Sequence, residues 1–192
     1  MAELLSLAKV AQAGIHDPAA TPFYVPWTDD SDRPGFVDEF VDHHEAALRN
    51  WHVDNWELQL VAFAGGRPVG VQTTRGKRFA ETRTVDTGSW LGLAWQGRGL
   101  GTELRAAVLS LAFDGLGALK ATSGAIAGNP QSLRVSRKLG YRETGSKTVA
   151  PRGEPLQELL LELRRDEFVS PVPVEIAGLD GLHSRFGSDR LA

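Results

Sequence analysis

The sequence of 192 residues contains no cysteine. That absence excludes disulfides, thiolate metal sites and a cysteine nucleophile. No stretch approaches the roughly 20 consecutive apolar residues that a membrane-spanning helix needs. Residues 1–16 lack a basic segment followed by a long apolar run, so they do not resemble a signal peptide. We therefore expect a cytoplasmic protein without a membrane partner.

Positive charge is also not in excess. The net charge of −3 gives no general attraction to nucleic acid, so none is expected as a partner. The hydrophobic fraction of 42% and the charged fraction of 23% are those of an ordinary globular protein. This length suits one domain with a proper hydrophobic core. We predict that residues 1–192 form a single domain.

Hydrophobic periodicity predicts a succession of helices and strands. Apolar positions at helical spacing predict helices over 2–13 and 36–51, separated by a loop over 17–35. The remaining predicted elements are strands over 56–63, from 69, over 82–93 and over 118–127, helices over 103–113 and from 130 to 140, a strand over 156–163, and one further strand at 172–176 in the C-terminal tail, residues 166–192. This order predicts an α/β domain with a mixed sheet. The helix after residue 102 shows an apolar stripe made of Leu100, Leu104, Ala107, Val108, Leu111 and Ala112.

A glycine-rich run, QGRGLGT at residues 96–102, separates a β-favouring segment from a strongly helical one. Such a turn brings backbone N–H groups and the positive end of a helix dipole to one point, which favours a phosphate group. Arg98 can add a charge-assisted contact. The run has no Gly-Lys-Ser/Thr of a Walker A loop, and it is one residue short of the Rossmann fingerprint. The alternative is an ordinary surface turn between a strand and a helix.

A second motif follows the next predicted strand. Residues 129–141 read NPQSLRVSRKLGY, in which Asn129 and Pro130 favour the start of a helix and Gly140 its end. The two motifs, in this order, resemble the two signatures of the GNAT acyltransferases, and in particular the branch of the RimJ/RimL type. The resemblance covers residues 55–165 well. It implies a mixed, mostly antiparallel twisted sheet with a splayed central strand pair and flanking helices.

The resemblance also implies a cofactor site for acetyl-CoA as co-substrate, although the sequence leaves another acyl-CoA open. The strand end would pair with the pantetheine arm, the glycine loop would hold the pyrophosphate, and the second motif would complete the site. For Asn129 the alternative is a helix cap, and for Lys138 it is a solvated charge. The implied cofactor-binding residues are Leu91, Gly92, Leu93, Gln96, Gly97, Arg98, Gly99, Leu100, Gly101, Thr102, Asn129, Ser132 and Lys138.

Acyl transfer to an amine needs a base, because an alkylammonium with a pKa near 10 is almost fully protonated at pH 7. Glu158 lies among apolar residues of a predicted strand, where a carboxylate is costly without a task. His44 has an ordinary pKa suited to proton transfer, although a structural role is the alternative. Ser136 stands where the family often has a tyrosine that protonates the leaving thiolate. It could instead bond back to the preceding helical turn.

Two further groups enter these predictions. Glu154 or Gln157 could face the site in place of Glu158. The adjacent residues His43 and His44 do not have the i, i+4 spacing of a helical zinc pair, so no metal is predicted. In the resemblance, a backbone N–H of Leu91 or Leu93 polarises the thioester carbonyl. With no cysteine, direct transfer from CoA to the amine is favoured.

The acceptor site is expected on residues 1–55 and the late strands. We predict a primary amine of a small molecule or peptide, such as a basic antibiotic, with a protein N-terminus as the alternative. A succinyl-CoA-dependent acyltransferase, a non-catalytic CoA-binding regulatory module and a nucleotide-binding protein are the rival functions. A homodimer is compatible with the sequence. Candidate acceptor residues are the aromatics Phe23, Tyr24, Trp27, Trp51, Trp56 and Trp90 and the carboxylates Asp29, Asp30 and Asp32, which could equally belong to an exposed loop.

Overall fold

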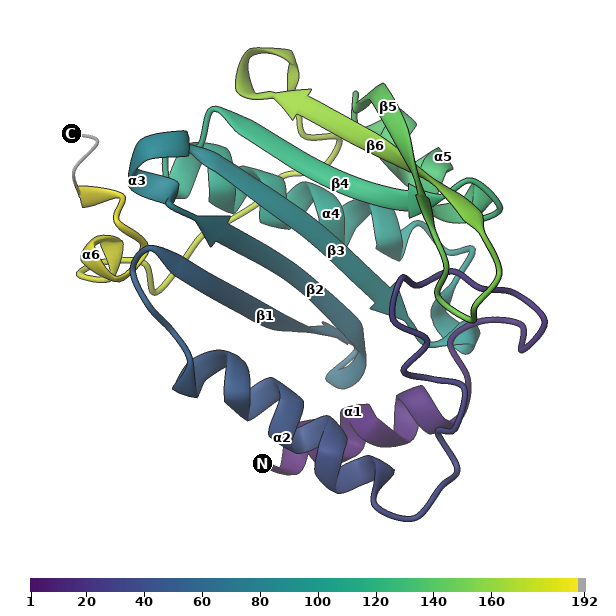
Figure 1. The fold of residues 1–192 in the computed structure, drawn as a ribbon. Coiled ribbons are helices and arrows are strands. Elements are labelled where there is room, and N and C mark those ends of the chain that lie inside the picture. The colour runs from purple at the N-terminus through teal and green to yellow at the C-terminus, as the bar shows by residue number, and fades with distance from the viewer. Residues whose placement is uncertain (190–192) are drawn as a thin grey trace.

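The computed structural model describes residues 1–189, which form one mixed sheet with helices on both faces (Figure 1). The strands lie in the order β1-β2-β3-β4-β6-β5. The elements along the chain are α1 (Ala2–Gln12), α2 (Phe36–Arg49), β1 (Asn55–Ala64), β2 (Arg67–Lys77), α3 (Phe79–Thr82), β3 (Thr84–Leu91), a 3-10 turn (Leu93–Trp95), α4 (Leu100–Ser110), a π turn (Leu111–Gly115), β4 (Lys120–Ile126), α5 (Pro130–Lys138), β5 (Arg142–Val149), β6 (Leu156–Arg164), a 3-10 turn (Arg165–Glu167) and α6 (His183–Phe186).

Neighbouring strands are antiparallel except at the centre of the sheet. There β3 and β4 run parallel, and they pair only where residues 84–86 meet residues 120–122. Beyond these three pairs the two strands diverge, as Figure 1 shows. The unpaired ends are residues 87–91 of β3 and residues 123–126 of β4. The sheet is therefore split at its one parallel pair.

The two faces of the sheet bury separate cores. Helices α4 and α5 pack on one face, where Leu109, Phe113 and Leu163 are among the fully or almost fully buried side chains. Helices α1 and α2 pack on the other face, where Leu7 and Phe40 meet residues of β2 and β3. Because successive residues of a strand point to opposite faces, β1 and β3 contribute to both cores, whereas β4 and β6 contribute only to the first. Within the described residues, no helix is long and apolar enough to cross a membrane.

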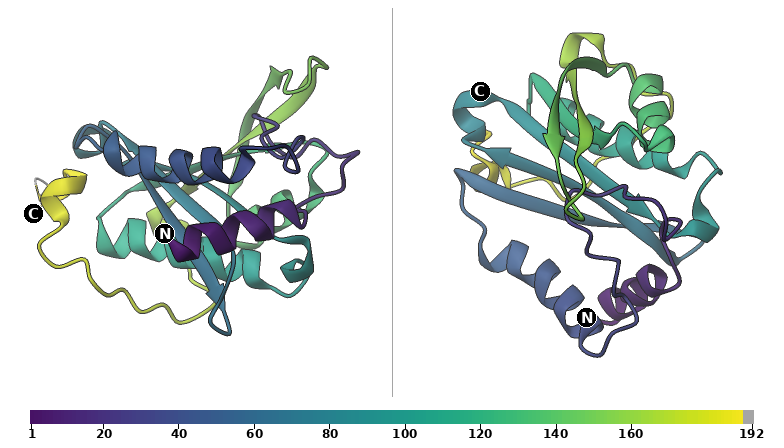
Figure 2. Two further views of the ribbon diagram at one scale, coloured as in Figure 1. Left: turned by 90° about the horizontal axis from the view of Figure 1, so that it is seen from below. Right: turned by 45° about the vertical axis from the view of Figure 1, so that its right-hand side comes forward.

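Two segments far apart in the sequence close the ends of the molecule. The 13–35 loop lies beside the tip of the β5–β6 hairpin (Figure 2), where Arg152 Nε donates to Asp29 at 2.7 Å. At the opposite end, the C-terminal segment packs Phe186 edge-on against both Trp51 and Trp56, with ring centroids 5.1 and 5.0 Å away. The loop between α1 and α2 and the end of α2 are thus held by contacts with the last quarter of the chain.

Most elements predicted from periodicity are present, and three expectations are wrong. Residues 172–176 form no strand, since two prolines, Pro171 and Pro173, remove backbone donors there. The strand β5 was not predicted, because its side chains are almost all exposed and show no apolar period. In α4 the buried face is shifted from the expected stripe: Ala107 is exposed, while Arg105 and Ala106 are buried.

Candidate functional site

The split between β3 and β4 is the centre of the candidate site. Gly92 N–H donates to the Val69 carbonyl at 2.9 Å. Since successive residues of an antiparallel pair alternate in hydrogen-bonding direction, the N–H and C=O of Leu91 point away from β2 and toward β4. Leu93 differs, because its N–H donates to the Gly14 carbonyl at 3.0 Å. Of the two predicted carbonyl-polarising amides, only that of Leu91 faces the split.

The glycine loop turns the chain from the end of β3 into α4. Gly97 and Gly99 have φ angles of 73° and 89°, in the left-handed region that side chains with a Cβ rarely adopt. Gly99 is the N-cap of α4, and its carbonyl accepts from the N–H of Thr102 and Glu103. The first amides of the helix, those of Leu100 and Gly101, have no intrahelical partner. Their N–H groups and the helix dipole give the loop the anion-binding character predicted from its sequence.

Two side chains fix the shape of this loop. Gln96 Nε2 donates to the carbonyls of Ile15 and Leu91, both at 2.8 Å. It therefore ties the loop to the segment that follows α1 and to β3, and its side chain is a structural anchor. The guanidinium of Arg98 lies 5.3 Å from the ring centroid of Trp95, in a cation–π contact.

The second motif forms α5 beside the loop. Asn129 caps the helix, since its side-chain oxygen accepts from the N–H of Ser132 at 3.1 Å. Asn129 therefore caps the helix, and its side-chain amino group remains available as a donor. A Cβ on Gly101 would lie 3.6 Å from Val135, so α4 and α5 are in close contact here. Lys138 is exposed near the C-terminus of α5.

Ser136 is completely buried, and its hydroxyl has no hydrogen-bond partner in the described chain. The expected alternative, a bond back to the preceding turn, is not formed. An unpaired buried hydroxyl is costly, and it can serve a ligand as donor or acceptor. Tyr141 is different, because its hydroxyl lies 2.9 Å from Thr87 Oγ1 on β3 and burial raises its pKa. Tyr141 is thus a packing residue that joins α5 to the split sheet.

Glu158 lies on the face of the sheet that carries α1 and α2, and its side chain crosses the neighbouring strand β4. A Cβ on Gly124 would lie only 2.0 Å from Glu158 Oε1, so the carboxylate occupies the space that a side chain would fill. Lys147 Nζ lies 3.0 Å from Glu158 Oε2, and the side chain of Glu158 is 16% exposed. The carboxylate is therefore paired with Lys147 and directed over the strand that borders the split. Gln157 instead bonds Thr148 on the outer strand β5.

His44 is buried on α2, the helix that packs beside β1. Its Nδ1 lies 2.8 Å from the Phe40 carbonyl, which makes Nδ1 the protonated nitrogen. Nε2 is then an acceptor, and it has no hydrogen-bond partner in the described chain. Burial lowers the pKa of His44, so its imidazole is neutral at pH 7. These are the properties that a general base requires, although the structure does not bring His44 and Glu158 into contact.

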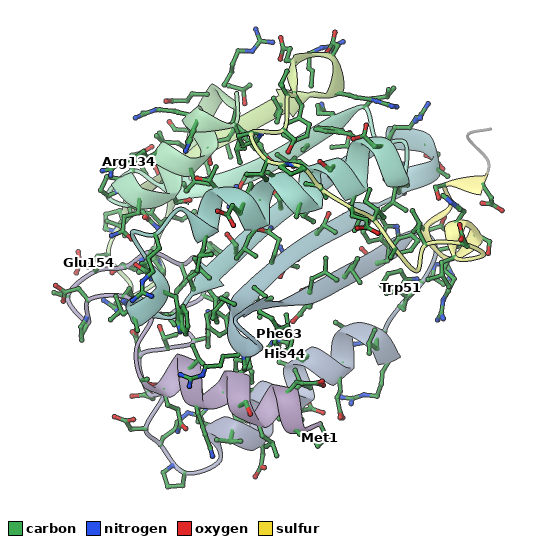
Figure 3. All side chains as sticks on the ribbon, turned by 180° about the vertical axis from the view of Figure 1, so that it is seen from behind. Met1, His44, Trp51, Phe63, Arg134 and Glu154 are labelled. Carbon is green, nitrogen blue, oxygen red and sulfur yellow. The ribbon has the colours of Figure 1, made fainter. Side chains whose placement is uncertain are left out.

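The predicted aromatic residues fall into two groups. Trp27 and Trp90 pack with Phe40 beside α2, with ring centroids 5.6 to 6.2 Å apart. Trp51 and Trp56 lie at the far end of α2, against the C-terminal segment (Figure 3). Only the first group adjoins β3 and the split. Of the three loop carboxylates, Asp29 is held by Arg152, and this pairing lowers its pKa.

Sequence reasoning missed Arg105, which is only 3% exposed. It lies on α4 beneath the split, where its guanidinium donates to Ser123 at 3.3 Å and to Ser89 at 3.2 Å. The sequence held a signal for the burial of Arg105, because this residue directly precedes the apolar residues 106–109. The predicted apolar stripe was placed one residue away from the face that is buried. As for metals, residues 1–189 contain no group of three or more His, Cys, Asp or Glu that could hold an ion.

A mixed sheet split at its parallel pair, with a glycine loop at the mouth of the split, defines a class of acyl-transferring α/β domains. The sequence model of the acetyltransferase (GNAT) domain matches residues 5–142. The chain therefore belongs to the GNAT acetyltransferase family, and it is an N-acetyltransferase. This confirms the resemblance to the GNAT family, though not to its RimJ/RimL branch, and the fold predicted from the sequence.

Solved structures show the same fold at low sequence identity. YncA from Salmonella typhimurium, a putative acetyltransferase solved with its cofactor acetyl-CoA, has a TM-score of 0.61 and 21% identity over 89% of this chain and 93% of its own. The ribosomal-protein-S5-alanine acetyltransferase from Vibrio fischeri has a TM-score of 0.63 and 15% identity over 88% and 91%. A spermidine N-acetyltransferase SpeG chimera from Vibrio cholerae and hSSAT has a TM-score of 0.59 and 15% identity over 71% and 84%.

Proposed function

We propose that this protein transfers an acetyl group from acetyl-CoA directly to a primary amine of a small molecule or peptide. The observation that carries the proposal is the split between β3 and β4 with the glycine loop at its mouth. The residues present fit the donor, because the Leu91 amide faces the split while the buried Ser136 hydroxyl, on the adjoining α5, is unpaired. The structure solved with acetyl-CoA has this fold, which supports the choice of donor.

The donor is held in the proposed complex by three parts of the chain. The amides of the glycine loop and the start of α4 bind the pyrophosphate, with Arg98 beside them. The pantetheine arm lies along the diverging end of β3, as an added strand would, and reaches Asn129. The Leu91 N–H polarises the thioester carbonyl and stabilises the oxyanion that forms when the amine attacks.

Two proton transfers complete the reaction. A base removes a proton from the attacking amine, and an acid protonates the departing CoA thiolate. Glu158 is the proposed base, directly or through water, because its carboxylate is directed over β4 next to the split. His44 is the second candidate for the base, since its neutral imidazole presents an unpaired nitrogen. Ser136 is the proposed acid, or it holds the water that acts as one.

The acceptor is proposed to bind between the 13–35 loop, α2 and the β5–β6 hairpin. Trp27 and Trp90 provide an apolar wall there, and the carboxylates of the loop and of α2 attract a cationic amine. A small basic molecule, such as a polyamine or a basic antibiotic, suits this composition, and spermidine is the acceptor named for one similar fold. A protein N-terminus, as in the RimJ/RimL branch, is the second candidate, and a ribosomal protein is named for another.

The experiment that tests the proposal measures thiol release from acetyl-CoA in the presence of an amine panel. The panel contains spermidine, an aminoglycoside, a lysine-containing peptide and a peptide with a free N-terminal alanine. We expect release above the hydrolysis background with at least one amine, and a loss of about 10²-fold or more in kcat for Glu158→Gln. Arg67→Gln, a substitution at the exposed first residue of β2, serves as the control.

Three outcomes would contradict parts of this proposal. Binding of CoA without turnover for every amine would favour the regulatory module. Preference for ATP or NAD over CoA in a titration would overturn the donor assignment itself. Full activity of Glu158→Gln together with loss of activity in His44→Gln would move the role of base to His44.

A further inference from the structure

Asp86 is a charged residue on the acceptor side of the sheet, and it has no role in the proposed mechanism. It lies on β3 in the last residue pair that joins β3 to β4, opposite Thr122. Strand residues alternate between the two faces, and Trp90, four residues further on, packs in the core beneath α1 and α2. Asp86 therefore projects from the same face as Glu158, at the point where the split begins. Its side chain is 49% exposed, so a ligand can reach it.

The floor of this face is bare between Asp86 and the mouth of the split. Gly88 is the next residue of β3 on this face, and Gly124 takes the matching place on β4. A Cβ on Gly88 would meet nothing closer than Arg75 at 3.8 Å, whereas the space above Gly124 is occupied by the Glu158 carboxylate. A ligand that lies on this floor can therefore touch the carboxylates of both Asp86 and Glu158.

The charge of Asp86 is only partly balanced. Arg75 is shared between two carboxylates, since it makes two contacts with Glu57, at 3.0 and 3.3 Å, and one with Asp86, at 3.4 Å. Thr122 Oγ1 donates to the other oxygen of Asp86 at 3.2 Å. Partial burial raises the pKa of Asp86 above its ordinary value, and the opposing effects of its neighbours, Arg105 on the far side of the sheet among them, do not outweigh it. An ammonium group of a ligand would supply the missing positive charge.

We propose that Asp86 selects acceptors that carry a second ammonium group, so that linear diamines are preferred over monoamines. The proposal rests on the proposed function, in which Glu158 meets the amine that attacks the thioester. At the level of Asp86 the strands β3 and β4 are still paired, so the donor cannot enter the sheet there. Asp86 is therefore a specificity residue, which binds the end of the acceptor that does not react.

The spacing of the two carboxylates fits a four-carbon diamine. Asp86 Oδ2 lies 3.2 Å from Thr122 Oγ1. Glu158 Oε1 lies 2.0 Å from the position that a Cβ of Gly124 would take. Strand residues rise about 3.3 Å each, so positions 122 and 124 are about 6.6 Å apart and the two carboxylates are about 7 Å apart. The nitrogens of an extended 1,4-diaminobutane are about 6 Å apart, and each can form a charge-assisted hydrogen bond of about 2.8 Å with one carboxylate.

The test compares three four-carbon ligands that differ in the charge at their far end. Titration calorimetry on the full chain, in the presence of saturating CoA, measures the binding of 1,4-diaminobutane, butylamine and 4-aminobutanoate. We expect 1,4-diaminobutane to bind at least about tenfold more tightly than butylamine, and 4-aminobutanoate to bind most weakly. In Asp86→Asn the preference for the diamine over butylamine should fall to about twofold or less, while butylamine binds as before.

A matched control removes the same charge elsewhere. Asp166 is an exposed aspartate after the end of β6, and it is also paired with an arginine, since Arg164 Nε donates to it at 3.2 Å. Asp166→Asn should retain the full preference for the diamine. Asp86→Asn keeps the size of the side chain and an acceptor for Thr122. Should it nevertheless not fold, the comparison of the three ligands in wild type decides alone.

The outcomes separate this proposal from the proposed function. A preference for the diamine in binding, without acetyl transfer to any amine, would contradict the proposed function alone. Equal affinity of wild type for 1,4-diaminobutane and butylamine, together with acetyl transfer to both, would overturn only the role of Asp86. Loss of kcat for butylamine in Asp86→Asn would also overturn it, because Asp86 would then act on the attacking amine and not on the second ammonium group.

Discussion

Single residues in this protein show how burial sets chemical character. His44 and Glu158 were both selected from the sequence as candidate bases, and the structure gives them opposite electrostatic surroundings. Glu158 is paired with Lys147, whereas His44 is packed against Phe40 with ring centroids 4.3 Å apart. His44 is thus a neutral histidine with a fixed tautomer, and it adds no charge to its surroundings.

The stability of the protein should depend on the protonation of His44. Burial lowers the pKa of His44 in the folded state below its ordinary value of 6.5. The unfolded chain therefore binds a proton first, so stability is fully present above about pH 6.5 and is lost as the pH falls through the folded-state pKa. Urea unfolding at pH 7.5 and pH 5.5 should show this loss in wild type. In His44→Gln the loss should be smaller.

The comparison has an internal control, because the other four histidines are the same in both proteins. If His44→Gln lost as much stability as wild type between the two pH values, the pH dependence would arise elsewhere.

The position of Glu158 could be predicted from the sequence only in part. Its chemistry was visible from its apolar sequence neighbours, but its place across β4 depends on Gly124, which only the strand register brings beside it.

At the scale of elements, the glycine loop depends on backbone conformation more than on side chains. Gly99 has a φ of 89° at the N-cap of α4, and a Cβ there would meet nothing closer than 3.8 Å. Gly99→Val is therefore strained by its backbone and not by crowding, at a cost of about 1–2 kcal/mol. Because relaxation of this strain reorients the loop amides, CoA affinity should fall by about tenfold or more.

A matched control isolates the loop from the general effect of strain. Gly66, in the turn between β1 and β2, has a φ of 73° and would have no atom within 4 Å of an added Cβ. Gly66→Val should lose similar stability in thermal unfolding while CoA affinity measured by calorimetry stays the same. Equal losses of affinity in the two variants would remove the loop from the donor site.

The elements that the sequence predicts well are those in which local signals agree. The Asn129-Pro130 start of α5 and the glycine loop before α4 appear where expected. By contrast, β5 is an exposed edge strand whose only strong constraint is pairing with β6, so its own pattern carries no signal. The shifted face of α4 has a related cause. Arg105 is a charged residue, so the sequence pattern predicts that it is exposed. It is buried because its guanidinium donates to serines on the two diverging strands.

At the scale of the whole molecule, the C-terminal segment packs into the same hydrophobic core as α4 and β4, but it lies far from the β3–β4 split. The segment crosses the end of the sheet and inserts Phe186, which is 5% exposed, beside Trp51 and Trp56. Both indoles also donate to its backbone, Trp51 to Arg185 at 2.9 Å and Trp56 to Phe186 at 3.2 Å. These two tryptophans, which the sequence offered as candidate acceptor residues, pack against the C-terminal segment in the structure.

This division predicts that the C-terminal segment stabilises the fold without affecting donor binding. Phe186→Ala removes a buried aromatic side chain and should lower the free energy of unfolding by about 3–5 kcal/mol. Since distant sites act additively, CoA affinity at a temperature where the variant is folded should match wild type. Val169→Ala, at a side chain that is 83% exposed, should change stability by less than about 0.5 kcal/mol. Urea unfolding and calorimetry measure both quantities, and a weaker affinity for CoA in Phe186→Ala alone would show that the segment and the split are coupled.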